Sequence, residues 1–220
     1  MTNEESPEVP DQTDALKSEG TIDRIVDRVV RMNGGLAREH IRRFGGGKVG
    51  SELLIRLDRQ YRITLTGSGA AVGGAAAAPG VGTGVALALS GAEAIATLEA
   101  TMLYVLSYAE ITGIHVEDAE RRRTLLMAVL LGGSGQKTIE RMVGRTGKHW
   151  GKKVAEAVPL QTIRQINKVL GQNFVTRYGT KQGIVVIGRL APFGIGAALG
   201  GIMGAVSSTV VIRATRKAFA

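Results

Sequence analysis

Three glycine–lysine stretches contain residues whose types and spacing could do chemistry, because phosphate-binding loops place a lysine directly after a glycine-rich turn. The lysines are Lys48, Lys137 and Lys148. Lys137 follows a glutamine instead of the required glycine, and Lys48 and Lys148 precede valine and histidine instead of serine or threonine. No convincing strand precedes any of them, although such a strand aims the loop at phosphate. We interpret all three stretches as turns at helix ends.

Other catalytic or metal-binding arrangements find little support in the sequence. His40, His115 and His149 each lack a second ligand three or four residues away, which argues against a local metal site. The chain has no cysteine, and this excludes thiol nucleophiles and disulfides. Glu93 and Glu99 interrupt an apolar helix; we expect them on its solvent side, the alternative being a buried ionisable pair. We therefore predict a protein that is not an enzyme and has no cofactor.

Charge is distributed unevenly along the chain. Residues 1–20 hold six acids and one base, and because the whole chain carries +9, residues 21–220 carry +14. A basic body suggests an anionic partner, either a membrane surface or nucleic acid, while a merely solubilising surface is the alternative. Trp150 stands among bases, a setting that suits a lipid interface, a nucleic acid or a protein core. The acidic start is unlike a secretory signal, so we expect no export.

Apolar residues recur at helical spacing through most of the chain, and no strand-type alternation stands out. Residues 1–20 are expected to be a disordered tail and residues 21–220 one helical domain. The helices are predicted over about 21–32, 36–44, 51–61, 81–111 and 117–131, with a basic helical region over 134–181. The side chains expected to face inward are Ile22, Ile25, Val26, Val29, Val30, Leu53, Leu54, Leu57, Tyr61, Ile163, Ile166, Leu170 and Phe174. Gly113 is predicted to end the long helix.

Two uncharged segments rich in glycine and alanine are the most unusual features. Residues 63–92 and 190–212 contain no charge, and Pro79 splits the first into a bent helix or two helices. The second would span roughly 34 Å as one helix, close to the thickness of a bilayer. Small residues recur every fourth position, at Gly69, Gly73 and Ala77 and again at Gly196, Gly200 and Gly204.

Small residues at this spacing let two helices approach closely, both in lipid and inside a tightly packed soluble bundle. The pattern therefore predicts helix pairing at these six positions and leaves two interpretations of segment 190–212 open. It is either a membrane-spanning helix or a core helix. In the first case Arg189, Arg213, Arg216 and Lys217, which flank the segment, would lie at the membrane interface.

The order of these features resembles the EcsC protein family from about Ser51 to Ala220. The resemblance depends on the glycine- and alanine-rich run 67–91, the helix end Tyr108-Ala109-Glu110-Ile111-Thr112-Gly113, and Leu190-Ala191-Pro192-Phe193-Gly194-Ile195-Gly196-Ala197-Ala198 before a small-residue helix. Many members have an asparagine in that last helix, where this chain reads Ala205-Val206-Ser207-Ser208. The resemblance implies a bacterial helical protein and supplies no catalytic residue.

Taken together, the sequence predicts an all-α helical bundle on the cytoplasmic side of a bacterial membrane, with segment 190–212 as a candidate integral helix. Its expected role is structural or accessory, through binding an anionic membrane surface, a membrane protein or a second copy of itself. The alternative is a soluble basic helical module that binds a protein or nucleic acid.

Overall fold

The all-α prediction is confirmed, because every regular element in the described part of the chain is an α-helix. The computed structural model describes residues 24–31, 34–76, 83–147, 149–189 and 195–220. Within these ranges, it describes the backbone alone for residues 34, 72–76, 83–91, 175, 177–189 and 195–203. Residues 24–30 are helical. The other helices are α2 (Gly34–Phe44), α3 (Gly50–Ala76), α4 (Thr83–Ile111), α5 (Ala119–Leu131), α6 (Gly133–Val143), α7 (Trp150–Glu156), α8 (Leu160–Arg189) and α9 (Ile195–Phe219). The acidic tail lies outside the described residues.

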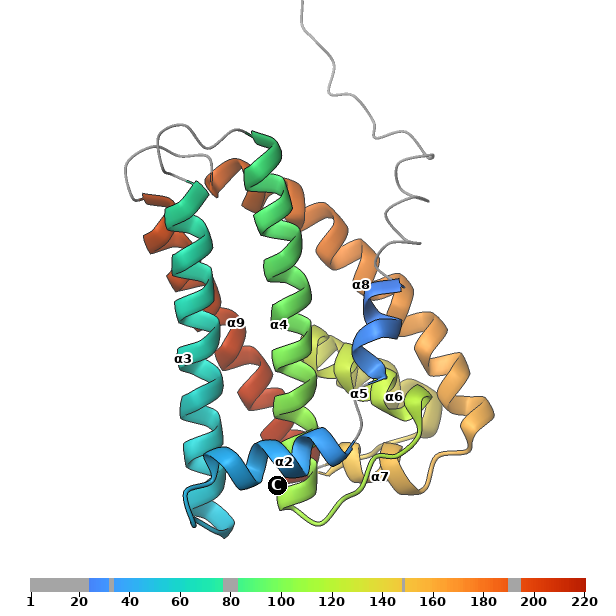
Figure 1. Cartoon of the computed structure of the whole chain (residues 1–220). Coiled ribbons are helices and arrows are strands. Elements are labelled where there is room, and N and C mark those ends of the chain that lie inside the picture. The colour runs from blue at the N-terminus through green and yellow to red at the C-terminus, as the bar shows by residue number, and fades with distance from the viewer. Residues whose placement is uncertain (1–23, 32–33, 77–82, 148, 190–194) are drawn as a thin grey trace, which may run out of the picture.

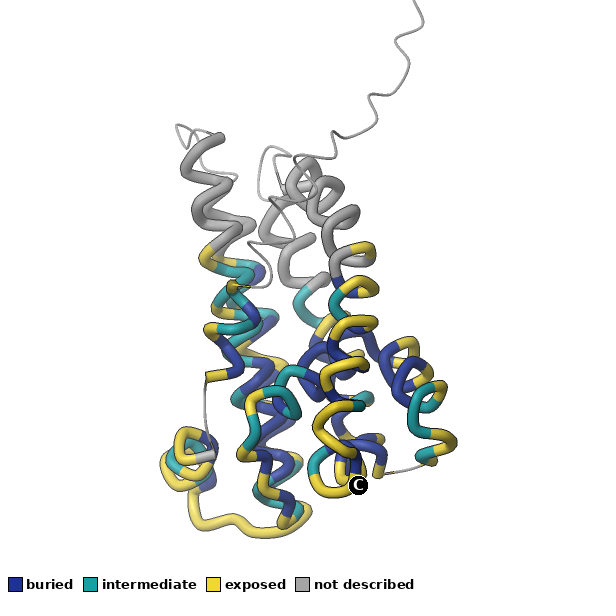
Figure 2. The backbone as a smooth tube through the Cα atoms, turned by 90° about the vertical axis from the view of Figure 1, so that its right-hand side faces the viewer, coloured by how far each residue is buried: buried dark blue, intermediate teal, exposed yellow. Residues whose placement is uncertain are grey.

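The helices form one bundle in which α3, from the first half of the chain, meets the last helix, α9. Figure 1 shows α3 and α4 side by side, α9 crossing behind them, and α8 on the far side of α5 and α6. Helix α3 makes its most extensive contacts with α9, and it also packs against α4, while α5 packs against α8. In Figure 2 the buried positions follow the inward sides of the helices. Ten of the thirteen residues predicted to face inward are buried, Ile25 and Leu54 are half-buried, and Ile22 lies outside the described residues.

Helix α3 continues to Ala76, so the helix predicted to end near Tyr61 and the helical small-residue stretch predicted before Pro79 form one element. Glycines and short polar residues lower helix propensity in this stretch, but propensity is a weak preference that tertiary packing overrides. Here the packing partner is α9. Pro79 and Ala77 lie outside the described residues. On their far side, α4 begins at Thr83, close to the predicted start.

The end of α4 has the hydrogen bonds of a glycine-terminated helix, as predicted for Gly113. The Gly113 amide donates to the carbonyl of Glu110 at 3.0 Å, and the Ile114 amide donates to that of Ala109 at 2.9 Å. Gly113 has φ +79°, a conformation that a side chain would strain. The chain then turns sharply, and the buried Ile114 covers the helix end.

Helix α5 is the centre of the core. Asp118 caps its start by accepting a 3.0 Å hydrogen bond from the Arg121 amide. Every residue from Thr124 to Leu131 is buried, so the apolar run that was predicted to be too short for a bilayer forms the innermost helix. Gly135 lies against the α5 backbone, where an added Cβ would come within 2.4 Å of the Ala128 carbonyl oxygen.

The buried guanidinium of Arg122 fastens the helical segment 24–30 to the loop before α5. It donates to the carbonyls of Val30 at 2.7 Å, Val116 at 3.2 Å and Glu117 at 2.5 Å. A buried cation needs such acceptors, because removing it from water without them would cost on the order of several kcal/mol of desolvation free energy. This burial lowers the pKa of Arg122.

Candidate functional site

The exposed side chains that best fit a binding function lie on α2, the turn after it and the first half of α3. Nine large apolar side chains are exposed among the described residues, and five of them fall within these elements. They are Leu36, Phe44, Val49, Ile55 and Ile63. The exposed bases around them are Arg38, Arg42, Arg43, Lys48, Arg56, Arg59 and Arg62. We call these twelve side chains the basic apolar face.

The helical repeat of α3 explains why its part of this face is continuous. Ile55, Arg59 and Ile63 are spaced four residues apart and therefore share one side of the helix, with Arg62 beside them. The opposite side carries residues that pack into the core, such as the buried Leu57. Ile55 and Ile63 are each 63% exposed, an unusual degree for isoleucine. We call Ile55, Arg59, Arg62 and Ile63 the α3 ridge.

Most bases of the face already bond to neighbours within the protein. The pairs are Arg38 with Glu110 at 3.2 Å, Arg42 and Arg43 with Glu39, Lys48 with Glu52 at 2.9 Å, and Arg56 with the Phe44 carbonyl at 2.6 Å. Hydrogen bonds from Arg43 and then Arg42 lower the pKa of Glu39. By contrast, Arg59 and Arg62 bond to no other residue in the described part of the chain. Exposed ion pairs are weak and exchange readily, but the two ridge arginines are available without any exchange.

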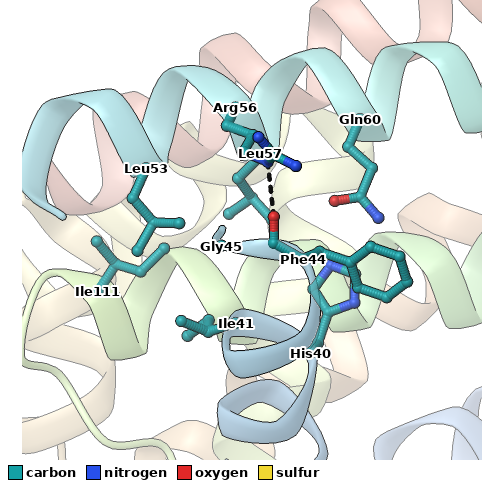
Figure 3. A pocket seen from close by; sticks show the side chains of 9 residues that line it. All are labelled: His40, Ile41, Phe44, Gly45, Leu53, Arg56, Leu57, Gln60 and Ile111. Atoms are coloured by element: carbon teal, nitrogen blue, oxygen red, sulfur yellow. Dashed lines mark hydrogen bonds between the residues drawn. The ribbon is translucent and has the colours of Figure 1, made fainter. Parts of the chain in front are cut away.

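A hollow between α2 and α3 interrupts the face, but it is too small for a ligand. Figure 3 shows it lined by the side chains of His40, Phe44 and Arg56 among others, with Arg56 bonded to the Phe44 carbonyl. Its enclosed volume is about 10 Å³, room for about one water molecule. The rings of His40 and Phe44 are 4.9 Å apart, and burial lowers the pKa of His40.

Behind the α3 ridge, a buried carboxylate joins the three helices α3, α4 and α9. Asp58 accepts a 2.5 Å hydrogen bond from the Tyr104 hydroxyl and a 2.9 Å bond from Nε of Arg216. Tyr61 stacks on Tyr104 with ring centres 4.4 Å apart and shares a 2.8 Å hydrogen bond with Thr101. Burial, reinforced by Asp58, raises the pKa of Tyr104, so the phenol stays protonated. This cluster holds α3 in place against α4 and α9.

Of the predicted helix-pairing positions, Gly204 lies directly against another helix. An added Cβ would meet the backbone of α3, at 2.3 Å from the Leu65 carbonyl oxygen and 3.1 Å from the Cα of Thr66. Gly69 on α3 is buried. The contact joins two helices of the same chain. The surroundings of Gly73, Ala77, Gly196 and Gly200 lie outside the described residues.

The four bases predicted for a membrane interface have different environments. Arg213 and Lys217 are exposed on α9, in agreement with a surface role, and Arg189 ends α8 with its side chain outside the described set. Arg216 instead binds the buried Asp58, and the hydrogen bond raises the pKa of its guanidinium. Sequence reasoning had no signal for that pairing, because Asp58 is 158 residues away.

The predicted uncharged segment 190–212 is not a separate element. Helix α9 begins at Ile195 and continues beyond the segment to Phe219. Ser208, Val211 and Ile212 are buried in the core, while residues 190–194 lie outside the described residues. Among the described residues, one segment, Ala92–Ile111 of α4, is long and apolar enough to cross a membrane. Core helices of soluble proteins have the same property, and 44% of its most apolar stretch is buried.

The residues singled out for chemistry do not gather into a site. No group of three or more potential metal ligands occurs in the described part of the chain. Trp150 is buried in the core with 1% exposure, which decides against a lipid or nucleic-acid contact for it. Glu99 is 42% exposed beside Arg28, as expected for the solvent side of α4. His115 bonds to Glu110 at 2.9 Å in the turn after α4.

No protein-family model, no curated protein and no solved structure matches this chain. A function therefore has to be inferred from the basic apolar face. Sequence reasoning missed the α3 ridge, although a signal was available. Ile55 and Ile63 fall opposite the inward-facing Leu53, Leu57 and Tyr61, and two isoleucines eight residues apart on the outer side of a helix indicate a contact surface.

Proposed function

We propose that this chain is a non-catalytic, EcsC-like accessory protein that attaches peripherally to an anionic membrane surface through the basic apolar face. One observation carries the proposal, the combination of exposed bases with exposed isoleucine, phenylalanine and valine on α2 and α3. A surface of this kind places apolar side chains among the lipid headgroups while its bases attract the negative charge. The resemblance to the EcsC family and the overall charge of +9 are in accord with this role.

The composition of the face favours lipid over nucleic acid. Surfaces that bind nucleic acid combine lysine and arginine side chains with aromatic or hydrogen-bonding side chains that reach the nucleobases. Here Ile55 and Ile63 occupy the two ends of the α3 ridge, and isoleucine has little to contribute to a phosphate backbone. Transfer of each isoleucine into the headgroup region would contribute roughly 1–2 kcal/mol, and each well-placed base about 1 kcal/mol. Such contributions support reversible attachment.

Co-sedimentation with lipid vesicles tests the proposal. The wild-type chain should bind vesicles of phosphatidylcholine mixed with phosphatidylglycerol, and it should bind vesicles of phosphatidylcholine alone far more weakly. The double variant Ile55→Ser/Ile63→Ser should lose roughly 2–4 kcal/mol and so reduce binding to the anionic vesicles by roughly 30- to 1,000-fold. A matched control is Leu160→Ser/Val169→Ser, which replaces two exposed apolar residues on α8, at 36% and 37% exposure.

Three results would contradict the proposal. These are equal binding to both kinds of vesicle, equal losses in the two double variants, or no binding to either lipid mixture. Retention on DNA or RNA with a steep dependence on salt, in the absence of vesicle binding, would instead support the alternative soluble module. In cells, release from the membrane fraction by high salt is expected, whereas release by detergent alone would indicate an integral helix.

A further inference from the structure

We infer that the acidic N-terminal segment, residues 1–20, binds the α3 ridge of its own chain and competes there with anionic lipid. The inference deepens the proposed function and rests on it. The α3 ridge has two arginines that can bind carboxylates, because Arg59 and Arg62 bond to no other residue in the described part of the chain. They lie beside two isoleucines that are each 63% exposed. This surface therefore accepts a ligand that offers both carboxylates and small apolar groups.

The N-terminal segment has the complementary chemistry. Residues 1–20 contain six carboxylates and one amine, and their apolar side chains include Val9 and Leu16. Carboxylates form bidentate hydrogen bonds with guanidinium groups, the strongest kind of ion pair at a surface. The remaining 200 residues carry +14, so the field of the body attracts this segment. No 20-residue stretch that begins after residue 20 carries more than four acids.

The N-terminal segment is long compared with the helix that carries the ridge. The described structure begins at Arg24, and the residues before it could extend to roughly 75–80 Å at 3.3–3.6 Å per residue. Helix α3, with 27 residues, is only about 40 Å long. A tethered segment has an effective concentration on the order of millimolar, so an affinity of ~0.1–1 mM would weaken vesicle binding by roughly two- to tenfold.

Two measurements on the full-length chain test the inference. In the first, all six acids of residues 1–20 are replaced with their amides, Glu→Gln and Asp→Asn, which keeps the length of the segment. Binding to phosphatidylglycerol-containing vesicles should become two- to tenfold tighter than for the wild type. The matched control replaces two exposed acids of the body, Glu117→Gln and Glu156→Gln, which lie away from the ridge on the loop before α5 and on α7. Equal tightening in both variants would overturn the inference.

The second measurement needs no lipid and so separates the inference from the proposed function. The chain has no cysteine, so Ser6→Cys gives a single attachment site for a nitroxide label. The label should broaden the NMR signals of Ile55, Arg59 and Ile63, and leave those of Val169 on α8 unchanged. The amide-substituted segment should lose this effect. Uniform broadening, or none, would overturn the inference even if vesicles bind. Selective broadening without vesicle binding would uphold the contact and refute lipid as its competitor.

Discussion

Replacing Gly204 with alanine should separate α3 from α9 and destabilise the protein. The added Cβ would lie 2.3 Å from the Leu65 carbonyl oxygen and 2.8 Å from its carbonyl carbon, where ordinary contacts begin at 3.4 Å. The obstructing atoms belong to the α3 backbone and cannot rotate away. The two helices would therefore have to move apart by about 1 Å, which loosens the contacts around them.

The expected size of the effect follows from two opposing contributions. Overpacking in a well-packed interface costs typically ~1–3 kcal/mol. Alanine in a helix is more favourable than glycine by up to ~1 kcal/mol, which offsets part of that cost. We expect a net loss of about 1–2 kcal/mol in the free energy of unfolding. At ~2–4 °C per kcal/mol for a chain of this size, the melting temperature should fall by roughly 2–8 °C.

Gly67→Ala on α3 is the matched control, because nothing lies within 4 Å of the Cβ that it would add. Alanine raises the helix propensity at this position and causes no clash, so the Gly67→Ala variant should have a free energy of unfolding higher by ~0.5–1 kcal/mol. Urea titrations followed by circular dichroism measure both variants against the wild type. Stabilisation of the same size in Gly204→Ala and Gly67→Ala would refute the close contact of α3 with α9.

Four further substitutions test buried and half-buried polar groups. Thr215→Val should raise the free energy of unfolding by about 1 kcal/mol, because the buried Thr215 hydroxyl has no partner among the described residues. Thr101→Val should lower the free energy of unfolding by ~1–3 kcal/mol, because the Tyr61 hydroxyl loses its hydrogen bond with Thr101. Urea titrations should show changes of opposite sign in the free energy of unfolding for these two variants. Burial lowers the pKa of His40, so this side chain binds a proton less readily in the folded state than in the unfolded chain. Protonation of the unfolded chain therefore reduces the free energy of unfolding as the pH falls below ~6.5. His40→Gln should show less acid destabilisation than the wild type between pH 7.5 and 5, and parallel pH profiles would disprove this. Asp58→Asn should cost ~1–3 kcal/mol, since its arginine partner is half exposed; an unchanged melting temperature would show that the carboxylate is dispensable.

Local signals in the sequence were enough to locate most helices. Gly113 after an apolar helix predicted the end of α4, and the periodic Ile163, Ile166 and Leu170 predicted the buried side of α8. These features depend on residues within one or two helical turns, for which propensity and periodicity are informative. The same signals did not show that α3 continues unbroken past Tyr61, where it packs against α9, a helix more than 100 residues away.

The buried polar groups and the candidate site were harder to predict, for a related reason. The run Arg121-Arg122-Arg123 has the composition of a solvent-exposed helix start, yet Arg122 is buried by carbonyls of the segment 24–30 and the loop before α5. The isoleucines Ile55 and Ile63 would by type belong to a core. They are exposed because none of the described helices covers the outer side of α3, and that depends on how the helices pack together.

The pairing of Arg216 with Asp58 has a consequence for how the chain is made. The two residues are 158 positions apart, so on a ribosome that adds ~5–20 residues per second, Asp58 waits roughly 8–30 s for its partner. During that time the side of α3 that α9 will cover remains open. Completion of the fold is therefore a late event, set by the arrival of the C-terminal helix, and a nascent chain stalled before α9 is the species most in need of a chaperone.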